Sequence, residues 1–351
     1  MDLQEIVDDI ARVLDAPATL EDRAFQLLAY AAQSGDIDAV RRESILRRRA
    51  SDEVRAYFEG YGIATATGPV RVPGDQGLGV LARVCVPLRH REVTYGYLWL
   101  LDSGALTDAH LTQVAPLVDR AAAALAQEAR RRQDLGVRLR DLLSADPEVR
   151  AGVRLELPGP VAAIAVQSAS GRVAPLWTLP RGVPADAGDP VTAVLAPAAQ
   201  ARAVAERVRA MYGTAAGIGG PRQDTGEAWR SWREARLALR AAQRVARFAP
   251  VAAWTDLGVH RLLVRLSPAE LADLAGEAAA LDAELARTVV TYLDQGGRAR
   301  DTAARLGVHR QTLYYRLAKA ERLTGLDLDD GENRLVLHLG LKAAELLAGP
   351  A

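Results

Sequence analysis

One short segment near the end of the chain gathers the side chains that proteins use to contact DNA. Lys and Arg side chains contact phosphates, a glutamine amide and a guanidinium can each make paired hydrogen bonds to a base edge, and hydroxyl groups can do either. Leu313 and Leu317, four residues apart, predict that this segment is a helix with its apolar face turned inward. The opposite face carries Arg310, Gln311, Thr312, Tyr314, Tyr315, Arg316 and Lys319. We expect these residues to bind double-stranded DNA; the alternative is the solvated polar face of a structural helix.

The residues around this helix predict a helix-turn-helix. Ala303 is small, as is needed where two helices approach closely, and Gly307 suits a tight turn that requires positive φ. Val308 adds an apolar contact between the two helices. Arg298 and Arg300 lie in the loop that enters the first helix, where they would suit phosphate contacts.

Two neighbouring features have structural interpretations. His309 is expected to cap the second helix and not to read a base, and Gly296 and Gly297 are expected to end the preceding helix. The stretch from Glu284 to Gly325 holds eight Arg or Lys residues against four acidic ones, which is a local charge of +4. This modest basic surface fits a small, specific DNA-binding domain.

The motif HRQTLYYRLAKAERLTGLDLDD, from His309 to Asp330, is followed by RLVLHLGLK. Together they resemble the C-terminal domain of the PucR (purine catabolism regulator) family of bacterial transcription factors, related to the sugar-diacid (CdaR-type) regulators. Gln311 stands where that family usually has Asn, a departure that concerns the base contact and not the fold. The resemblance implies a DNA-binding transcriptional regulator that responds to a small metabolite.

Length and composition describe an ordinary globular protein. The chain has 351 residues, enough for two or three domains, with 44 basic and 44 acidic residues. Cys85 is the only cysteine, so an intrachain disulfide is excluded and a reducing cytoplasm is compatible. No apolar run approaches the length of a membrane-spanning helix, and the acidic start is unlike a signal peptide. We therefore expect a cytoplasmic protein without membrane contact.

The first segment mixes helical and strand patterns. A helix is predicted from Asp2 to Leu14, two short strands from Thr19 to Ala32, a helix from Asp36 to Gly60, and a β-hairpin from Ala82 to Asp102. This order, with a hairpin ending in GYLWLLD, resembles a GAF-type sensory domain.

A nearly continuous helix is predicted from Asp108 to Leu143, with Thr107 or Asp108 as its N-cap. Its apolar stripe is interrupted only from Glu128 to Gln133. Such a helix could bury its stripe against a second copy of the chain and form a homodimer. The alternative is a helix packed within one protomer and continuing into a linker.

The middle segment alternates strands and helices, which favours an α/β sandwich. Strands are predicted at Pro160–Val166, Arg172–Leu176, Val191–Leu195 and Thr214–Ile218, and helices at Ala198–Met211 and Thr225–Arg247. This segment resembles the GGDEF-like domain that accompanies this helix-turn-helix in its family. It lacks the acidic pair that cyclase chemistry needs for metals, so we expect it to be non-catalytic.

GIGGP, from Gly217 to Pro221, lacks the Lys-Ser/Thr of a phosphate-binding loop and is interpreted as a turn. Cys85 is expected to be a buried small hydrophobe, with a redox sensor as the alternative. The five histidines have no metal-binding spacing, and no catalytic triad or carboxylate pair stands out. No metal, cofactor or catalytic residue is therefore expected.

Aromatic residues are concentrated in the first segment. In the predicted hairpin, Tyr95, Tyr97 and Trp99 alternate along one strand, so we expect them to share one of its faces. The aromatic residues of the first segment either build the core or line a ligand site. The candidate ligand residues are Tyr57, Tyr61, Tyr95, Tyr97 and Trp99.

These observations predict a multidomain α+β protein. The expected parts are a GAF-like α/β sensor (1–127), a helical linker (128–150), a degenerate cyclase-like α/β middle domain (151–266) and an all-α helix-turn-helix C-terminal domain (267–351). The expected function is a homodimeric transcriptional regulator controlled by a small-molecule effector. Two alternatives stay open: a nucleotide-processing enzyme with an accessory DNA-binding domain, and a protein-interaction module whose C-terminal helices dock a partner.

Overall fold

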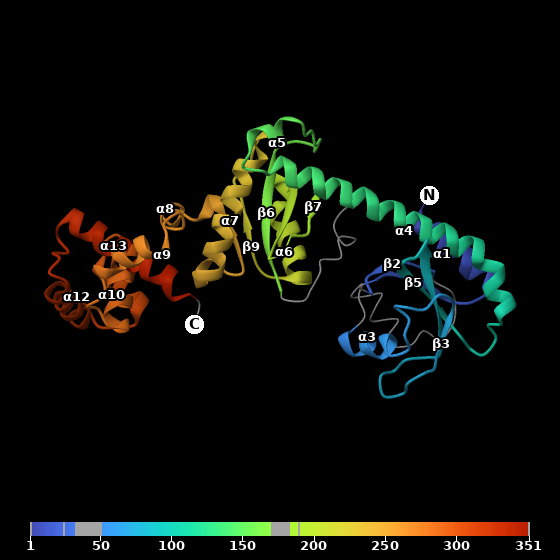
Figure 1. The fold of residues 1–351 in the computed structure, drawn as a ribbon. Coiled ribbons are helices and arrows are strands. Elements are labelled where there is room, and N and C mark those ends of the chain that lie inside the picture. Colours follow the sequence, from blue (N-terminus) through green and yellow to red (C-terminus); the bar gives the residue numbers. More distant parts are fainter. Residues whose placement is uncertain (1, 24, 32–50, 170–182, 189, 350–351) are drawn as a thin grey trace. The chain divides into compact units, whose positions relative to one another are not determined.

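The computed structural model describes residues 2–23, 25–31, 51–169, 183–188 and 190–349. They form two compact units, which divide between Val137 and Arg138 inside one long helix. The chain is mixed α/β with a helical C-terminal region, as the sequence predicted at that level (Figure 1). The division into a sensor, a linker, a middle domain and a C-terminal domain stays a prediction.

The first unit is built on a five-stranded antiparallel sheet with the order β2-β1-β5-β4-β3. Its strands are β1 (Ala18–Asp22), β2 (Leu27–Tyr30), β3 (Val70–Val72), β4 (Arg83–His90) and β5 (Val93–Leu101). Its helices are α1 (Leu3–Leu14), α3 (Asp52–Glu59) and α4 (Asp108–Leu142). The predicted first helix, the two short strands and the hairpin are confirmed, whereas the first part of the helix predicted from Asp36 lies outside the described residues.

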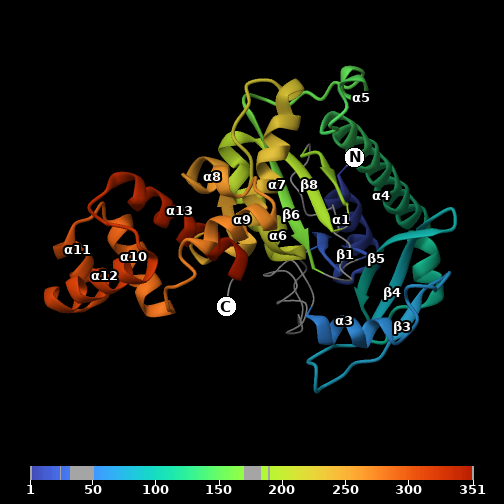
Figure 2. The same cartoon turned by 60° about the vertical axis from the view of Figure 1, so that its left-hand side comes forward.

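Two separate cores hold this unit together. On one face of the sheet, apolar residues of α1 and α4 pack against the strands, and on the other face α3 and loop residues pack around aromatic rings (Figure 2). The α4 stripe contributes Leu111, Val114, Val118 and Leu125 to the first core. Packing within one protomer therefore accounts for this part of the stripe.

The second unit begins with a sheet that has the order β10-β9-β6-β8-β7. Its strands are β6 (Val161–Ser168), β7 (Ala185–Asp186), β8 (Val191–Pro197), β9 (Gly213–Ile218) and β10 (Val251–Ala253). Helices α6 (Ala201–Tyr212) and α7 (Ala228–Arg244) pack against it. The predicted strands at β6, β8 and β9 and both predicted helices are confirmed, whereas the strand predicted at 172–176 lies outside the described residues.

Helix α5 (Pro147–Ala151) precedes this sheet, and the short helices α8 (His260–Leu263) and α9 (Pro268–Gly276) lead from it to the C-terminal helices. The C-terminal helices are α10 (Ala283–Asp294), α11 (Ala299–Leu306), α12 (Arg310–Thr324) and α13 (Gly331–Ala348). α9 crosses α13 at Gly340, where a Cβ atom would meet the backbone oxygen of Leu274 at 2.7 Å. The final helix, α13, has 18 residues and packs against both α9 and α10. In the part of the chain that the structure describes, no helix has the length and apolar character needed to cross a membrane.

Candidate nucleic-acid interface

A tight turn joins α11 and α12, as the sequence predicted. Gly307 ends α11 with φ of +67°, a conformation that glycine adopts without the strain a side chain would add. The backbone N–H of Val308 then donates to the carbonyl of Ala303 at 3.1 Å. His309 caps α12, because its Nδ1 accepts from the N–H of Gln311 at 3.3 Å. Gly296 and Gly297, both with positive φ, follow the end of α10, so their predicted role is also confirmed.

The inner face of α12 seats the helix on its neighbours. Leu313, Leu317 and Ala320 are buried in one apolar cluster with residues of α10 and α13 such as Val289 and Leu337. These contacts fix which face of α12 remains outward. Arg310, Gln311, Thr312, Tyr314 and Tyr315 are all exposed on that face.

Arg310 and Tyr314 form a pair one helical turn apart. The Arg310 guanidinium donates to the Tyr314 hydroxyl at 2.8 and 3.1 Å, and its carbon lies 5.2 Å from the ring centroid. Hydrogen bonds and cation–π attraction therefore hold this cation in place before any partner binds. Tyr315, next to the pair, is 66% exposed.

Arg316 and Lys319 differ from the other candidates. Arg316 donates to a carboxylate oxygen of Glu284 at the start of α10, and its side chain is only 21% exposed. Lys319 is half-buried. Arg316 thus braces α12 against α10 in this structure, a role that the sequence reasoning missed because Glu284 lies 32 residues away.

Arg298 and Arg300 lie at the start of α11 and both are exposed. Arg298 forms an ion pair with Asp301 at 2.9 Å, whereas the described residues provide no such partner for Arg300. The arrangement can supply phosphate contacts from the start of α11 and base contacts from the first turns of α12.

A partly buried polar network, which the sequence reasoning also missed, lies behind these helices. Lys342 of α13, one of the two lysines in the chain, donates to Asp294 of α10 at 2.9 Å and has a side chain only 5% exposed. His338 bonds the same carboxylate at 2.9 Å. Burial raises the pKa of Asp294, but the bonds and charges of Lys342 and His338 outweigh it and lower that pKa below its ordinary value.

His260 of α8 connects to the same side of α13. Its ring lies 3.8 Å from the carboxylate of Glu345 and bonds the guanidinium of Arg247 at 2.9 Å. The nearby His260 ring lowers the pKa of Glu345. Helix α13 therefore contacts α10 at Asp294 and α8 at His260. In this way it connects the helix-turn-helix to residues that follow the second sheet.

This network predicts a pH-dependent weakening of α10 and α13. Burial lowers the pKa of His338, the charges of Lys342 and Arg247 act in the same direction, and Asp294 opposes them. Because the folded pKa lies below the unfolded value near 6.5, His338 favours the folded state above pH 6.5. That contribution is lost as pH falls from there through the folded pKa.

We expect amide hydrogen exchange in α10 and α13 to speed up between about pH 7.5 and about pH 5.5, after correction for the intrinsic pH dependence of exchange. His338→Gln should flatten this response, and His110→Gln, a change at an exposed histidine of α4, should not. An unchanged response in His338→Gln would show that another group is responsible.

The aromatic candidates of the first unit pack against one another. Tyr97 and Trp99 are buried beside Phe58, whose ring centroid lies 4.4 Å from that of Trp99. Tyr57 and Tyr61 are on and just after α3, and the Tyr61 hydroxyl donates to that of Tyr57 at 3.2 Å. Their role in ligand binding stays a prediction.

The expectation that Tyr95 shares a strand face with Tyr97 and Trp99 is wrong. Gly96 pairs with Leu88, but Thr94 pairs with the next residue of β4, so Tyr95 is the extra residue of a β-bulge. Tyr95 packs instead against the core on the α1 and α4 side. A bulge cannot be seen in the alternation of residue types.

Cys85 is fully buried in the aromatic cluster, and burial raises the pKa of its thiol. A thiol that stays protonated reacts poorly with oxidants, which supports its interpretation as a small hydrophobe.

The prediction that GIGGP forms a turn is wrong. Gly217 and Ile218 end β9, the N–H of Gly219 donates to the carbonyl of Ala163 of β6 at 2.9 Å, and Arg222 forms an antiparallel bridge with Val161, so the segment runs on beside β6 and packs against α7. A Cβ atom on Gly219 would overlap the backbone oxygen of Ser231. The Ser231 hydroxyl donates to the carbonyl of Gly220 at 2.8 Å, and Glu234 accepts from the N–H of Gly220 at 2.9 Å. α7 and its side chains thus occupy the space that a phosphate would need. Within the described ranges, no group of three or more His, Cys, Asp or Glu side chains is placed to hold a metal ion.

Comparison with known proteins supports the helix-turn-helix. Residues 285–343 match the PucR C-terminal helix-turn-helix domain. Over 67 residues, the chain is 40% identical to the purine catabolism regulatory protein of Bacillus subtilis, covering 19% of this chain and 13% of that protein. The DNA-binding transcriptional activator AdeR of the same organism is 29% identical over 104 residues, which cover 28% of this chain and 25% of AdeR. The matches thus span a quarter or less of these two relatives.

A third relative matches along nearly the whole chain. The proline-responsive transcriptional activator PutR of Bacillus subtilis is 22% identical over 97% of this chain and 96% of its own. A solved structure, the regulator of polyketide synthase expression from Bifidobacterium adolescentis, is 22% identical and covers 60% of this chain and 91% of that one, with a TM-score of 0.30. The predicted resemblance to the PucR family is confirmed for the C-terminal helix-turn-helix.

Proposed function

We propose that this chain, whose residues 285–343 form a PucR-type helix-turn-helix, is a DNA-binding transcriptional regulator and not an enzyme. The observation that carries the proposal is the outer face of α12. Its exposed Arg310, Gln311, Thr312, Tyr314 and Tyr315 stand on a helix seated by buried Leu313 and Leu317. The relatives named above are described as transcriptional activators or a regulatory protein, which supports the same function.

Selection of bound fragments from the source genome tests this function. We expect recovered fragments to share a sequence and their affinity to fall as salt concentration rises, because contacts to phosphates release counterions. Binding to no fragment would contradict the proposal. Capture of a protein with no DNA binding would favour the interaction-module alternative.

The competing enzyme hypothesis needs a nucleotide site in the first or middle domain. The contacts of Ser231 and Glu234 with Gly220 argue against one at GIGGP. Incubation with ATP or GTP and magnesium should give no turnover, and turnover that survives Gln311→Ala would favour the enzyme.

We also propose the finer domain assignments. The sheet of the first unit, with its hairpin and flanking α1 and α4, supports a GAF-like sensor at 1–127. The second sheet supports a degenerate GGDEF-like domain at 151–266, joined by the helical linker 128–150. The sensor would respond to a small-molecule effector, and the aromatic residues near Trp99 are the candidate site that the sequence offers. PutR is described as a proline-responsive activator, which supports control by a small metabolite.

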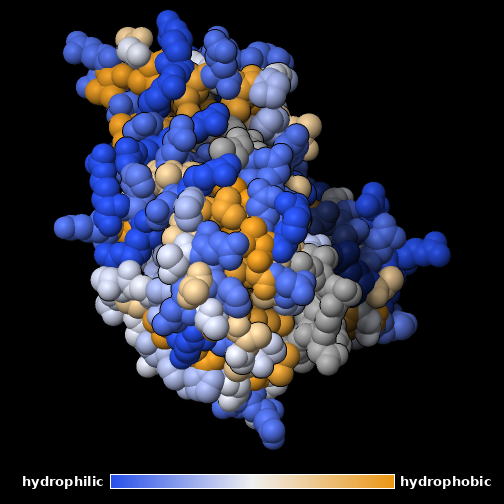
Figure 3. Space-filling view, turned by 90° about the vertical axis from the view of Figure 1, so that its right-hand side faces the viewer, coloured by the Kyte–Doolittle hydropathy of each residue, from blue (hydrophilic) through white to orange (hydrophobic). Residues whose placement is uncertain are grey.

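A homodimer is proposed because a single short motif reads few base pairs, so that two copies on paired half-sites would give useful specificity. Hydrophobic residues reach the surface at several places between hydrophilic ones on the face shown in Figure 3. Val137 of α4 is 45% exposed despite being apolar. The mass of the full chain in solution should be that of a dimer. Val137→Arg should weaken the association of the two copies more than Asp134→Asn on the same helix does. A monomer at micromolar concentration would remove this proposal.

A further inference from the structure

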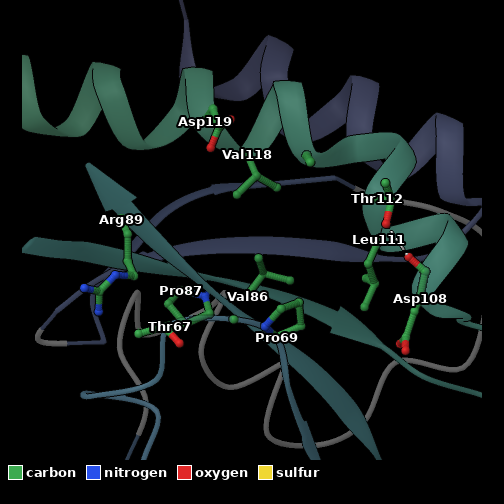
Figure 4. Close-up of a pocket in the computed structure, with 12 residues that line it drawn as sticks. Thr67, Pro69, Val86, Pro87, Arg89, Asp108, Leu111, Thr112, Val118 and Asp119 are labelled. Atoms are coloured by element: carbon green, nitrogen blue, oxygen red, sulfur yellow. Dashed lines mark hydrogen bonds between the residues drawn. The ribbon is translucent and has the colours of Figure 1, made fainter. Parts of the chain in front are cut away.

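A cavity of about 470 Å³ lies in the first unit between the start of α4, strand β4 and the loop before β3 (Figure 4). Its apolar walls include Val86, Leu111 and Val118, none more than 9% exposed. These three residues belong to the core shared with α1, on the face of the sheet opposite Trp99. Cavities of this size with apolar walls and a few polar groups are typical of small-molecule sites.

One cation and one anion at this cavity have no oppositely charged partner among the described residues. Arg89 donates to the carbonyls of Ala66 at 3.3 Å and Glu92 at 3.2 Å, so its charge is met only by neutral groups. Asp119 is an exposed residue of α4, and Figure 4 shows its carboxylate directed from the helix toward the sheet. Asp108, which also lines the cavity, differs because it pairs with Arg71 at 3.1 Å.

The cavity also lies beside the turn of α4 that contains Pro116. Pro116 lies inside this helix and has no N–H to donate to the carbonyl of Thr112. Leu111 and Thr112 line the cavity before the proline, and Val118 and Asp119 line it after. A molecule that contacts both sides would favour one bend of the helix over another.

We propose that this cavity binds a small zwitterion with an apolar side chain, in chemical terms an amino acid. Its carboxylate pairs with Arg89, its ammonium group pairs with Asp119, and its side chain packs against Val86, Leu111 and Val118. The proposal rests on the proposed regulatory function, because it places the effector directly on α4. It also gives a site separate from the aromatic cluster around Trp99.

Thermal unfolding of the full chain with each of the twenty amino acids tests the proposal. We expect at least one with an apolar side chain to raise Tm, because a ligand that binds only the folded state stabilises it. The amine without the carboxylate and the acid without the ammonium group should each fail to do so at the same concentration.

Calorimetric titration with the amino acid that raises Tm then locates the site. Asp119→Asn and Arg89→Gln should each weaken binding about tenfold or more, because each removes a charge-assisted bond. Asp134→Asn and Arg131→Gln, at exposed residues further along α4, are matched controls and should bind normally. Since Arg89 also holds the loop at Ala66, the circular dichroism spectrum of Arg89→Gln is compared with the wild type, and Asp119→Asn provides the test free of that contact.

No rise of Tm with any amino acid overturns the proposal. Unchanged affinity in Asp119→Asn also overturns it, and loss of affinity only in Trp99→Phe moves the site to the aromatic cluster. DNA affinity, measured separately on the same preparations, decides the regulatory function. A chain that binds DNA but no zwitterion contradicts this inference alone, whereas one that binds a zwitterion but no DNA contradicts the regulatory function.

Discussion

Replacing Gln311 with alanine is expected to weaken binding to the specific DNA site by about 1–3 kcal/mol. Gln311 is exposed at the start of α12, and its amide can pair with two atoms of one base edge. Alanine is a good helix former and leaves the His309 cap and buried Leu313 in place, so the fold should persist. Affinity for random DNA should barely change, because the neutral amide contributes little to phosphate attraction.

Fluorescence anisotropy with one specific and one random duplex, at one salt concentration, separates these effects. Gln133→Ala, at an exposed glutamine of α4, is the matched control and should bind both duplexes normally. Equal loss on the two duplexes would mean that Gln311 contacts only the DNA backbone.

Replacing Gly219 with alanine is expected to destabilise the second unit by about 3 kcal/mol or more. The added Cβ would overlap the backbone oxygen of Ser231, and a helix backbone cannot yield as a flexible side chain can. α7 would have to move away from the sheet and break the hydrogen bond from the N–H of Ala163 to the Ser231 hydroxyl.

Urea unfolding followed by circular dichroism measures this loss. Gly152→Ala is the control, because Gly152 has a negative φ and open space where a Cβ would lie. A Gly219→Ala protein as stable as Gly152→Ala would show that α7 does not pack tightly against Gly219.

Local patterns determined the elements of the DNA-binding region. The four-residue spacing of Leu313 and Leu317, the capping His309 and the turn at Gly307 all act within one or two helical turns. Each is a short-range effect, so the sequence alone predicted the helix-turn-helix and which face of α12 is outward. The hairpin of β4 and β5 was predicted for the same reason, because its two strands are adjacent in the chain.

Only the tertiary structure decided how these elements are used. Arg316 looked like its neighbours in sequence, but it is paired with Glu284, 32 residues away. Lys342 and Asp294 are separated by 48 residues and meet because α13 crosses α10. Tyr95 does not lie on the strand face that was expected, because one residue of β5 has no counterpart in β4. Such features depend on which residues far apart in the sequence come into contact. The periodicity of a sequence predicts only how residues are arranged within one helix or strand.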